Sequence, residues 1–405
     1  MKLISFYTII IVLCIVSCKQ STNKVEQSVN NPNVSDTLTV FSFDETPLFD
    51  TLTSDNIIES IKYIPLETND KSVFDDSRVI VKMIANQLLV VSNNIDKPFA
   101  KLFDFSGKYI KDLIHIGRGP LELLDIYGYV ANDSLKRVSF LGFDKIVTYD
   151  FVEDRLFANK MPQNDYMRFL PYMVSLNDGT FIGQQSGTGK ENRLDDNKMP
   201  YMYVLDSDFR IISNKYYSIK RKLHQNLISD VTAFPCESWH INSTSGGGVF
   251  IDMYCDTVYS ILDGGLLKPS YLIERGERYM PTIEEVNYPR DKKFKKIYYN
   301  AIVENGQYLF LKYYHKNSYY VNMWDKLNNK LLSHQIIESN YRSLINVSFD
   351  GYTGAPTIDY ITADNRIYTI IPTEKLIGVI PDLKKDDNAV IVEIKLKDNF
   401  NSVKQ

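Results

Sequence analysis

A strand–turn–strand unit that recurs along the chain constrains its fold more than any other feature. In each copy an apolar or aromatic strand ends in a polar turn of Asp, Asn or Gly, and a second strand leads away. The six copies span residues 102–110, 148–156, 203–212, 258–266, 321–331 and 367–376. Their turn centres lie near 107, 154, 208, 264, 328 and 374, so successive copies are 46 to 64 residues apart. This spacing suits one four-stranded propeller blade with loops of variable length.

Six copies predict an all-β fold, a six-bladed β-propeller over residues 37–405. A lone four-stranded sheet leaves two apolar faces in water, whereas radial stacking covers both and ring closure leaves only short edges. We expect strands from the N- and C-terminal ends to pair and close the ring. The C-terminal run 389–397 alternates with period two, and residues 37–43 and 57–66 supply N-terminal strands.

The first 18 residues have the pattern of an export signal. A basic start is followed by an apolar stretch of 14 residues from Leu3 to Val16, and the small Ser17 precedes Cys18. A helix that spans a membrane needs about 20 apolar residues, so the stretch is typical of a signal peptide. The order of residues 15–18 resembles the bacterial lipobox, in which the cysteine is diacylated and becomes the mature N-terminus. This resemblance implies a lipoprotein signal peptide over residues 1–17 and lipidation of Cys18.

Residues 18–36 are polar, which predicts a flexible tether between the lipid and the propeller. Lys19 follows the cysteine, and by resemblance to enteric sorting rules a residue other than Asp there favours the outer membrane. We therefore expect an outer-membrane lipoprotein of the cell envelope that faces the periplasm or the cell surface.

The charges and cysteines argue against several classes of site. The 46 Lys and Arg and 50 Asp and Glu form no long block of one sign, so we expect no nucleic-acid partner. Cys236 and Cys255 are the cysteines left after signal removal and acylation, and they either form a disulfide or lie as two separate buried thiols. No spacing typical of a metal site, a phosphate loop or a catalytic serine is present. We expect no metal and no cofactor.

The stretch 103–110, followed by 116–122, resembles the first full blade of bacterial six-bladed β-propeller lipoproteins of the TolB- and NHL-like group. The family's usual Gly-Pro-Gly-Glu-Tyr is here Gly119-Pro120-Leu121-Glu122-Leu123. The runs 256–259 and 386–390 also resemble family landmarks. The likeness covers roughly residues 37–397 and implies the fold, whereas most members carry no established activity.

Propeller geometry brings the residues that precede the inner strands to one funnel at the mouth of the ring. These residues are Arg118, Glu122, Tyr127, Arg168, Tyr172, Trp239, His240, Tyr298, Tyr299 and Tyr352. Aromatic rings with Arg, Glu and His suit sugar rings or an exposed peptide loop. The alternatives are packing between blades for each Tyr, and an ion pair between Arg118 and Glu122 within their own loop.

We predict a non-catalytic module that binds a glycan or an envelope protein at this funnel. A glycan lyase or hydrolase is the alternative, because carboxylates gathered from distant blades leave no local motif. A third alternative is a structural scaffold that makes its contacts through the outer rim.

Overall fold

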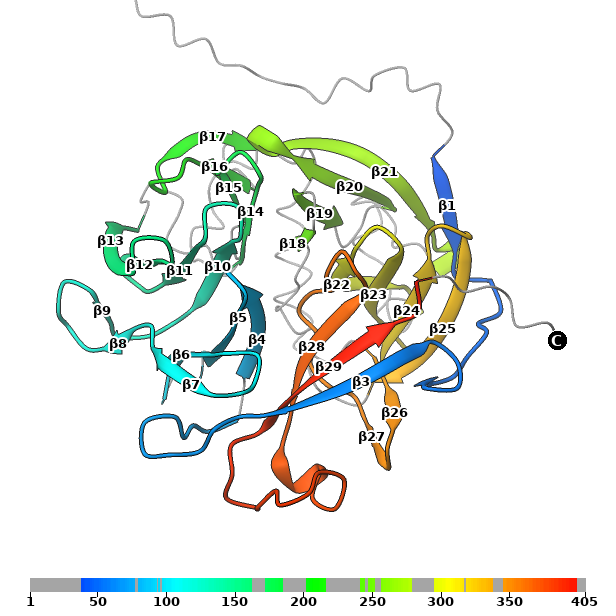
Figure 1. Ribbon diagram of the computed structural model, residues 1–405. Helices are drawn as coiled ribbons and strands as arrows, with labels where there is room; N and C mark the ends of the chain where they lie inside the picture. The colour runs from blue at the N-terminus through cyan, green and yellow to red at the C-terminus, as the bar shows by residue number, and fades with distance from the viewer. Residues whose placement is uncertain are drawn as a thin grey trace, which may run out of the picture. The chain divides into compact units, whose positions relative to one another are not determined.

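The computed structural model describes most of the chain after residue 37 (Figure 1). The described residues are 38–76, 79–92, 94, 97–161, 172–184, 202–215, 241–244, 247–251, 256–278, 295–316, 318–337 and 345–398. They fold as an all-β propeller. Its described helices are short 3₁₀ turns, η2 (Asp263–Gly265), η3 (Gly276–Arg278) and η5 (Thr373–Lys375). The predicted signal peptide, Cys18 and the tether lie outside the described residues.

Four antiparallel sheets follow the chain in order, each with the simple up-and-down order of a propeller blade. The first contains β4 (Val79–Ile84), β5 (Gln87–Ser92), β6 (Phe99–Phe103) and β7 (Tyr109–Asp112). The second contains β10 (Gly128–Asn132), β11 (Arg137–Leu141), β12 (Lys145–Asp150) and β13 (Arg155–Lys160). The third contains β14 (Tyr172–Ser175), β15 (Phe181–Gln184), β16 (Met202–Leu205) and β17 (Ile211–Lys215). The fourth contains β22 (Tyr298–Glu304), β23 (Tyr308–His315), β24 (Ser318–Asp325) and β25 (Lys330–Ile337).

Three further sheets include strands from the N-terminal part of the described chain. One is β18 (Ile241–Thr244), β19 (Gly247–Ile251), β20 (Thr257–Leu262) and β21 (Leu266–Glu274) with β1 (Thr39–Ser42) at its edge. The second is β2 (Leu52–Thr53), β26 (Val347–Phe349) and β27 (Tyr352–Gly354). The third is β28 (Arg366–Ile371), β29 (Val390–Leu396) and β3 (Ile58–Pro65). A two-stranded pair, β8 (His115–Ile116) and β9 (Glu122–Leu123), connects the first two sheets along the chain.

The propeller therefore has seven blades, and the predicted number of six is wrong. The unpredicted sheet is β2–β26–β27, whose β26–β27 hairpin turns at Asp350 and Gly351. This hairpin lies between the repeat copies centred near 328 and 374. Each of its two strands has only three residues, and so short a strand shows no alternation from which the sequence pattern could detect it.

The recurrent sequence unit is confirmed as the outer hairpin of a sheet at most of its copies. The pairs β6–β7, β12–β13, β16–β17 and β24–β25 each turn directly after an aspartate. The carboxylates of Asp104, Asp150, Asp206 and Asp325 accept the backbone N–H two residues on, at 2.8 to 2.9 Å. This Asx-turn geometry satisfies the turn's backbone donors locally. The weakest copy, 367–376, instead runs from β28 into η5.

The N-terminal segment 38–65 lies along the outer parts of four sheets (Figure 1, the blue strands). β1 pairs parallel with β21, Phe49 forms a bridge with Ser333 of β25, and β2 pairs parallel with β26. β3 then pairs antiparallel with β29 along its whole length. Strands from the two ends of the described chain thus share one sheet, as the sequence pattern predicted.

Two aromatic side chains anchor this segment in the core. Phe41 and Phe43 enter an apolar cluster in which Trp324 is fully buried. Their ring centroids lie 6.0 and 5.8 Å from that of Trp324. Tyr271 packs edge-on against Phe41 at 5.2 Å, and Tyr313 against Phe43 at 4.8 Å. The cluster therefore joins β1 to both the β18–β21 and the β22–β25 sheets, so burial of these rings contributes strongly to stability.

Replacing Phe41 by Ala should lower the free energy of unfolding by about 3 kcal/mol, because it opens a cavity beside Trp324. The neighbouring Val40 points the other way and is 41% exposed, so Val40→Ala should change stability by less than about 0.5 kcal/mol. Urea denaturation followed by tryptophan fluorescence measures both variants. Equal losses in the two would contradict the anchoring role of Phe41.

Candidate functional site

The inner strands bring side chains from several blades together at the centre of the propeller. Asn242 on β18 donates its side-chain N–H to the carbonyl oxygens of Ile302 on β22, at 3.2 Å, and of Asp359, at 2.8 Å. The ammonium of Lys82 on β4 lies 3.6 Å from the ring centroid of Tyr360. The backbone N–H of Met83 donates to the Tyr360 hydroxyl oxygen at 2.7 Å. Residues 359 and 360 thus contact strands from two different sheets, β18 and β4, and Asn242 adds a contact to β22.

We call Lys82, Asp133, Asn242, Asp359 and Tyr360 the central cluster. Lys82 keeps partial exposure while Tyr360 is buried. Burial lowers the pKa of Lys82 to about 8, against the opposing influence of the negative charges of Asp359 and Asp133. An ammonium on the face of a tyrosine ring is a cation–π contact, which is worth more where water is partly excluded. The central cluster therefore holds a partly solvated cation in fixed surroundings.

Asp133 follows β10 and is held as a carboxylate. It accepts the backbone N–H of Ala85 at 3.2 Å and the ammonium of Lys136 at 2.9 Å. Burial works to raise the pKa of Asp133, but these hydrogen bonds and the charges of Lys136 and Lys82 lower it below its usual value. The site thus combines a partly exposed cation, a stable anion, an amide that donates to backbone carbonyls and a buried aromatic ring. The cation and the anion can hydrogen-bond to hydroxyl groups of a ligand.

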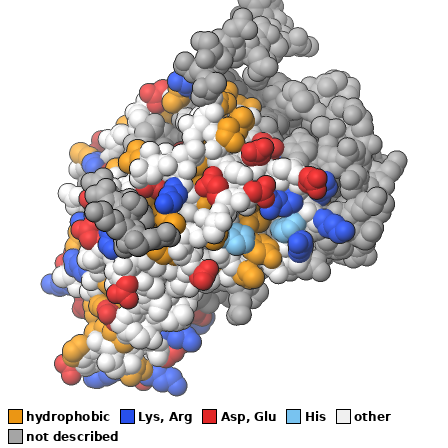
Figure 2. All heavy atoms as spheres, turned by 90° about the vertical axis from the view of Figure 1, so that its right-hand side faces the viewer, with side chains coloured by type: hydrophobic (Ala, Val, Ile, Leu, Met, Phe, Trp, Pro, Cys, Tyr) orange, Lys and Arg blue, Asp and Glu red, His pale blue; other side chains and the backbone are white. Residues whose placement is uncertain are grey.

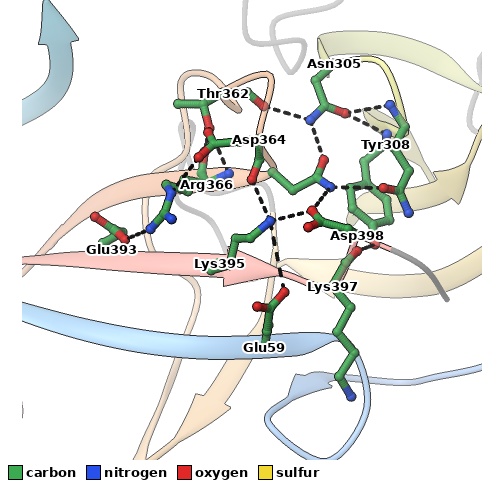
Figure 3. Close-up of polar contacts among 12 residues, drawn as sticks. Glu59, Asn305, Tyr308, Thr362, Asp364, Arg366, Glu393, Lys395, Lys397 and Asp398 are labelled. Carbon is green, nitrogen blue, oxygen red and sulfur yellow. Dashed lines mark hydrogen bonds and ion pairs between the residues drawn. The ribbon is translucent and has the colours of Figure 1, made fainter.

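A second polar network joins the turns that follow β22 and precede β28 (Figure 3). Asn305 donates to the carbonyl of Thr362 at 2.8 Å and to the side-chain oxygen of Asn365 at 2.7 Å. Asn365 in turn donates to Asp398 at 2.9 Å, and Lys395 pairs with the same carboxylate. These groups satisfy one another, so we assign the network to holding the two turns and the end of β29 together.

Glu122, one of the predicted funnel residues, stabilises its own loop. Its carboxylate accepts the backbone N–H of Gly119 at 2.7 Å. A Cβ atom on Gly117 would lie 2.1 Å from the same carboxylate, so a larger residue there would displace the Glu122 side chain. Among the described ion pairs none joins Glu122 to Arg118, whose side chain is exposed. The Gly117-Arg118-Gly119 run thus has a structural explanation.

Tyr298 and Tyr299 are 5% and 1% exposed and pack between sheets. The Tyr299 hydroxyl donates to Asp256 at 3.2 Å, and the guanidinium of Arg275 lies 4.5 Å from the Tyr299 ring centroid. Burial raises the pKa of Tyr298. Both rings are therefore buried in packing contacts, which was the alternative to ligand binding for the tyrosines.

The other predicted funnel residues are spread over the described structure or lie outside it. Tyr127 is half-buried, and burial together with a hydrogen bond to Asp125 raises its pKa. Tyr352 is half-buried with its ring 5.3 Å from that of Phe349. The backbone of Tyr172 is in β14. Arg168, Trp239, His240, Cys236 and Cys255 lie outside the described residues.

The central cluster itself was missed because its members leave no local signal. Met83 and the tyrosine that it contacts are 277 residues apart in the chain. The one available sign was a charged residue, Lys82, among the apolar residues that form β4.

Among the described residues, no group of three or more His, Cys, Asp or Glu side chains is placed to hold a metal ion. Within the same part of the chain, no helix has the length and apolar character needed to cross a membrane.

Comparison with known proteins supports the fold. A family model described as a domain of unknown function, DUF4934, matches residues 39–401. No curated protein matches. The fold is similar to that of a Bacteroides fragilis protein described as exported, with a TM-score of 0.62 and 15% identity, over 89% of this chain and 100% of that one. This similarity shows the fold alone.

Two further structures are more distant. A member of the DUF4221 family from Bacteroides vulgatus has a TM-score of 0.47 and 11% identity, over 84% of this chain and 98% of that one. Virginiamycin B lyase from Staphylococcus aureus has a TM-score of 0.38 and 10% identity, over 84% and 99%. Neither similarity is close enough to support a conclusion about this chain. Of the expected resemblance to TolB- and NHL-like lipoproteins, the β-propeller fold is confirmed, and membership of that group stays a prediction.

The Lys82 amine should titrate near pH 8, because burial disfavours its charged form. Reductive ¹³C-methylation followed by an NMR pH titration would show two lysine resonances with midpoints near 8, those of Lys82 and of Lys312, whose pKa burial also lowers to about 8, whereas exposed lysines titrate at about 10.4. One of these two resonances, that of Lys82, should disappear in Lys82→Arg. A midpoint near 10 for the Lys82 resonance would contradict the central placement of this amine.

Proposed function

We propose, from the premise that the chain belongs to the DUF4934 family, that it is a non-catalytic cell-envelope propeller that binds a ligand at the central cluster. The observation that supports this most is the partly exposed Lys82 ammonium held on the ring of Tyr360, with Asp359 and Asp133 nearby. A rigid group of donors, acceptors and an aromatic ring is characteristic of binding sites.

A glycan is the ligand class that this composition fits best. Sugar hydroxyls both donate and accept hydrogen bonds, and a carboxylate and an ammonium provide matching partners. The alternative of glycan hydrolysis needs one carboxylic acid with a raised pKa. The lowered pKa of Asp133 makes this residue unsuited to the role of general acid, which favours binding over hydrolysis.

We also propose that the protein is located in the cell envelope, as the sequence predicts. Lipidation of Cys18 would anchor the chain to the outer membrane, and residues 18–36 would tether the propeller. The Bacteroides fragilis protein of similar fold is described as exported, which supports an exported location. The β3–β29 pairing is proposed to close the ring, because it joins strands from both ends. Four of the predicted funnel residues keep some exposure and stay in the proposal as candidate ligand-binding residues: Arg118, Glu122, Tyr127 and Tyr352.

Replacing Lys82 by Met should weaken glycan binding at least tenfold, because it removes the charged donor and keeps the apolar stem. Lys108→Met is the matched control, since Lys108 is an exposed lysine beside the same sheet. A glycan array on the wild type would select the ligand, and isothermal titration calorimetry would then compare the variants. Equal affinities for the two variants, with equal melting temperatures, would remove the central cluster as the binding site.

A further inference from the structure

The β22–β25 sheet carries an aromatic ladder that runs from the core to the surface. Its members are Tyr313 on β23, Tyr320 on β24 and His334 on β25. The rings of Tyr313 and Tyr320 are stacked, with centroids 5.4 Å apart and planes within 14°. Tyr320 and His334 are stacked in the same way, at 5.3 Å and 20°. Three rings on three adjacent strands thus form one continuous stack.

The ladder is open to solvent at its outer end. Tyr313 is buried, Tyr320 is half-buried and His334 is exposed, and β25 is the outermost strand of its sheet. Ile336, directly opposite Tyr320 on β25, is 58% exposed. Figure 2 shows histidine side chains beside hydrophobic, basic and acidic side chains on this side of the molecule. Apolar surface of this kind, with a polar rim, is typical of a contact site.

The His334 ring is held in a fixed orientation. Its Nδ1 atom lies 2.7 Å from the side-chain oxygen of Asn322 and 3.2 Å from the Tyr313 hydroxyl. Among the described residues no hydrogen bond is made by the other ring nitrogen, Nε2. The ladder therefore presents a preorganised ring with one available polar atom, which lowers the entropic cost of binding.

The charged groups that lower the pKa of the two histidines at the ladder are cationic. Burial and the positive charge of Arg278 lower the pKa of His334. Burial, Lys316, Arg278 and His334 lower the pKa of His315, whose ring centroid is 6.3 Å from that of Tyr320. The Arg278 guanidinium lies 5.7 Å from the Phe43 ring centroid and pairs with the exposed Asp44. An anion at the ladder would gain from these cations.

We propose that the aromatic ladder is a second binding surface, independent of the central cluster, for an acidic oligosaccharide. An apolar face of a sugar ring packs on His334, the outermost ring of the stack, and the uronic carboxylate lies toward Arg278. The stack supplies the flat apolar surface, and the cations select the charged sugar over a neutral one.

Oligogalacturonate, neutral galacto-oligosaccharide of equal length and poly-glutamate are the probes for calorimetry on the full chain. The proposal predicts that oligogalacturonate binds at least tenfold more tightly than the other two. His334→Ala should weaken this binding at least fivefold, and Arg278→Gln should remove the preference for the acidic sugar. His115→Ala, which replaces an exposed histidine on β8, should leave the affinity unchanged.

Each contrary outcome would overturn the proposal. These outcomes are equal affinity for poly-glutamate, which would assign the surface to acidic peptides, no binding of oligogalacturonate, or unchanged affinity in both ladder variants. Matched melting temperatures of His334→Ala, Arg278→Gln and His115→Ala exclude unfolding as the cause of a loss. A variant with a lowered melting temperature is replaced by His334→Gln or Arg278→Met, to which the same criteria apply.

Discussion

Backbone pairing of the N-terminal segment with four sheets is the interaction on which the rest of this propeller depends. An exposed sheet edge presents unpaired backbone N–H and carbonyl groups that can pair with another chain. Residues 39–65 occupy such positions on β21, β25, β26 and β29 in turn. Phe41 and Phe43 add side-chain burial to this backbone pairing, so one segment both covers edges and joins neighbouring sheets.

The radial order of the sheets also determines which side chains meet at the centre of the propeller. Four of the outer hairpins turn on an aspartate that accepts backbone N–H groups of its own turn, as Asp104 and Asp325 do. The inner strands carry polar groups toward one another. Lys82 and Asn242 come from different sheets and meet the same segment around residue 359. A polar cluster at the centre therefore depends on the radial order of the sheets.

The predicted funnel and the observed structure differ for a physical reason. Position before an inner strand does not determine which way a side chain points. Tyr299 turns inward to pack under Arg275, and Glu122 turns back onto its own glycine loop. Both arrangements satisfy hydrogen-bonding groups, because a buried tyrosine needs a partner for its hydroxyl and a tight loop needs an acceptor for its N–H groups. The aromatic ladder was equally hidden, since its rings meet only when β23, β24 and β25 pair in register.

The sequence by itself determined the all-β propeller class, the outer hairpins and the pairing of strands from the two ends. These follow from short-range alternation and from turn residues such as Asp104 and Gly107, which act within a few neighbours. Tertiary structure alone decided the seventh sheet, the path of the N-terminal segment and the membership of both candidate surfaces. Such features join residues hundreds of positions apart, as Met83 and Tyr360 show. Hydrophobic periodicity carries no information on which distant strand will become a neighbour.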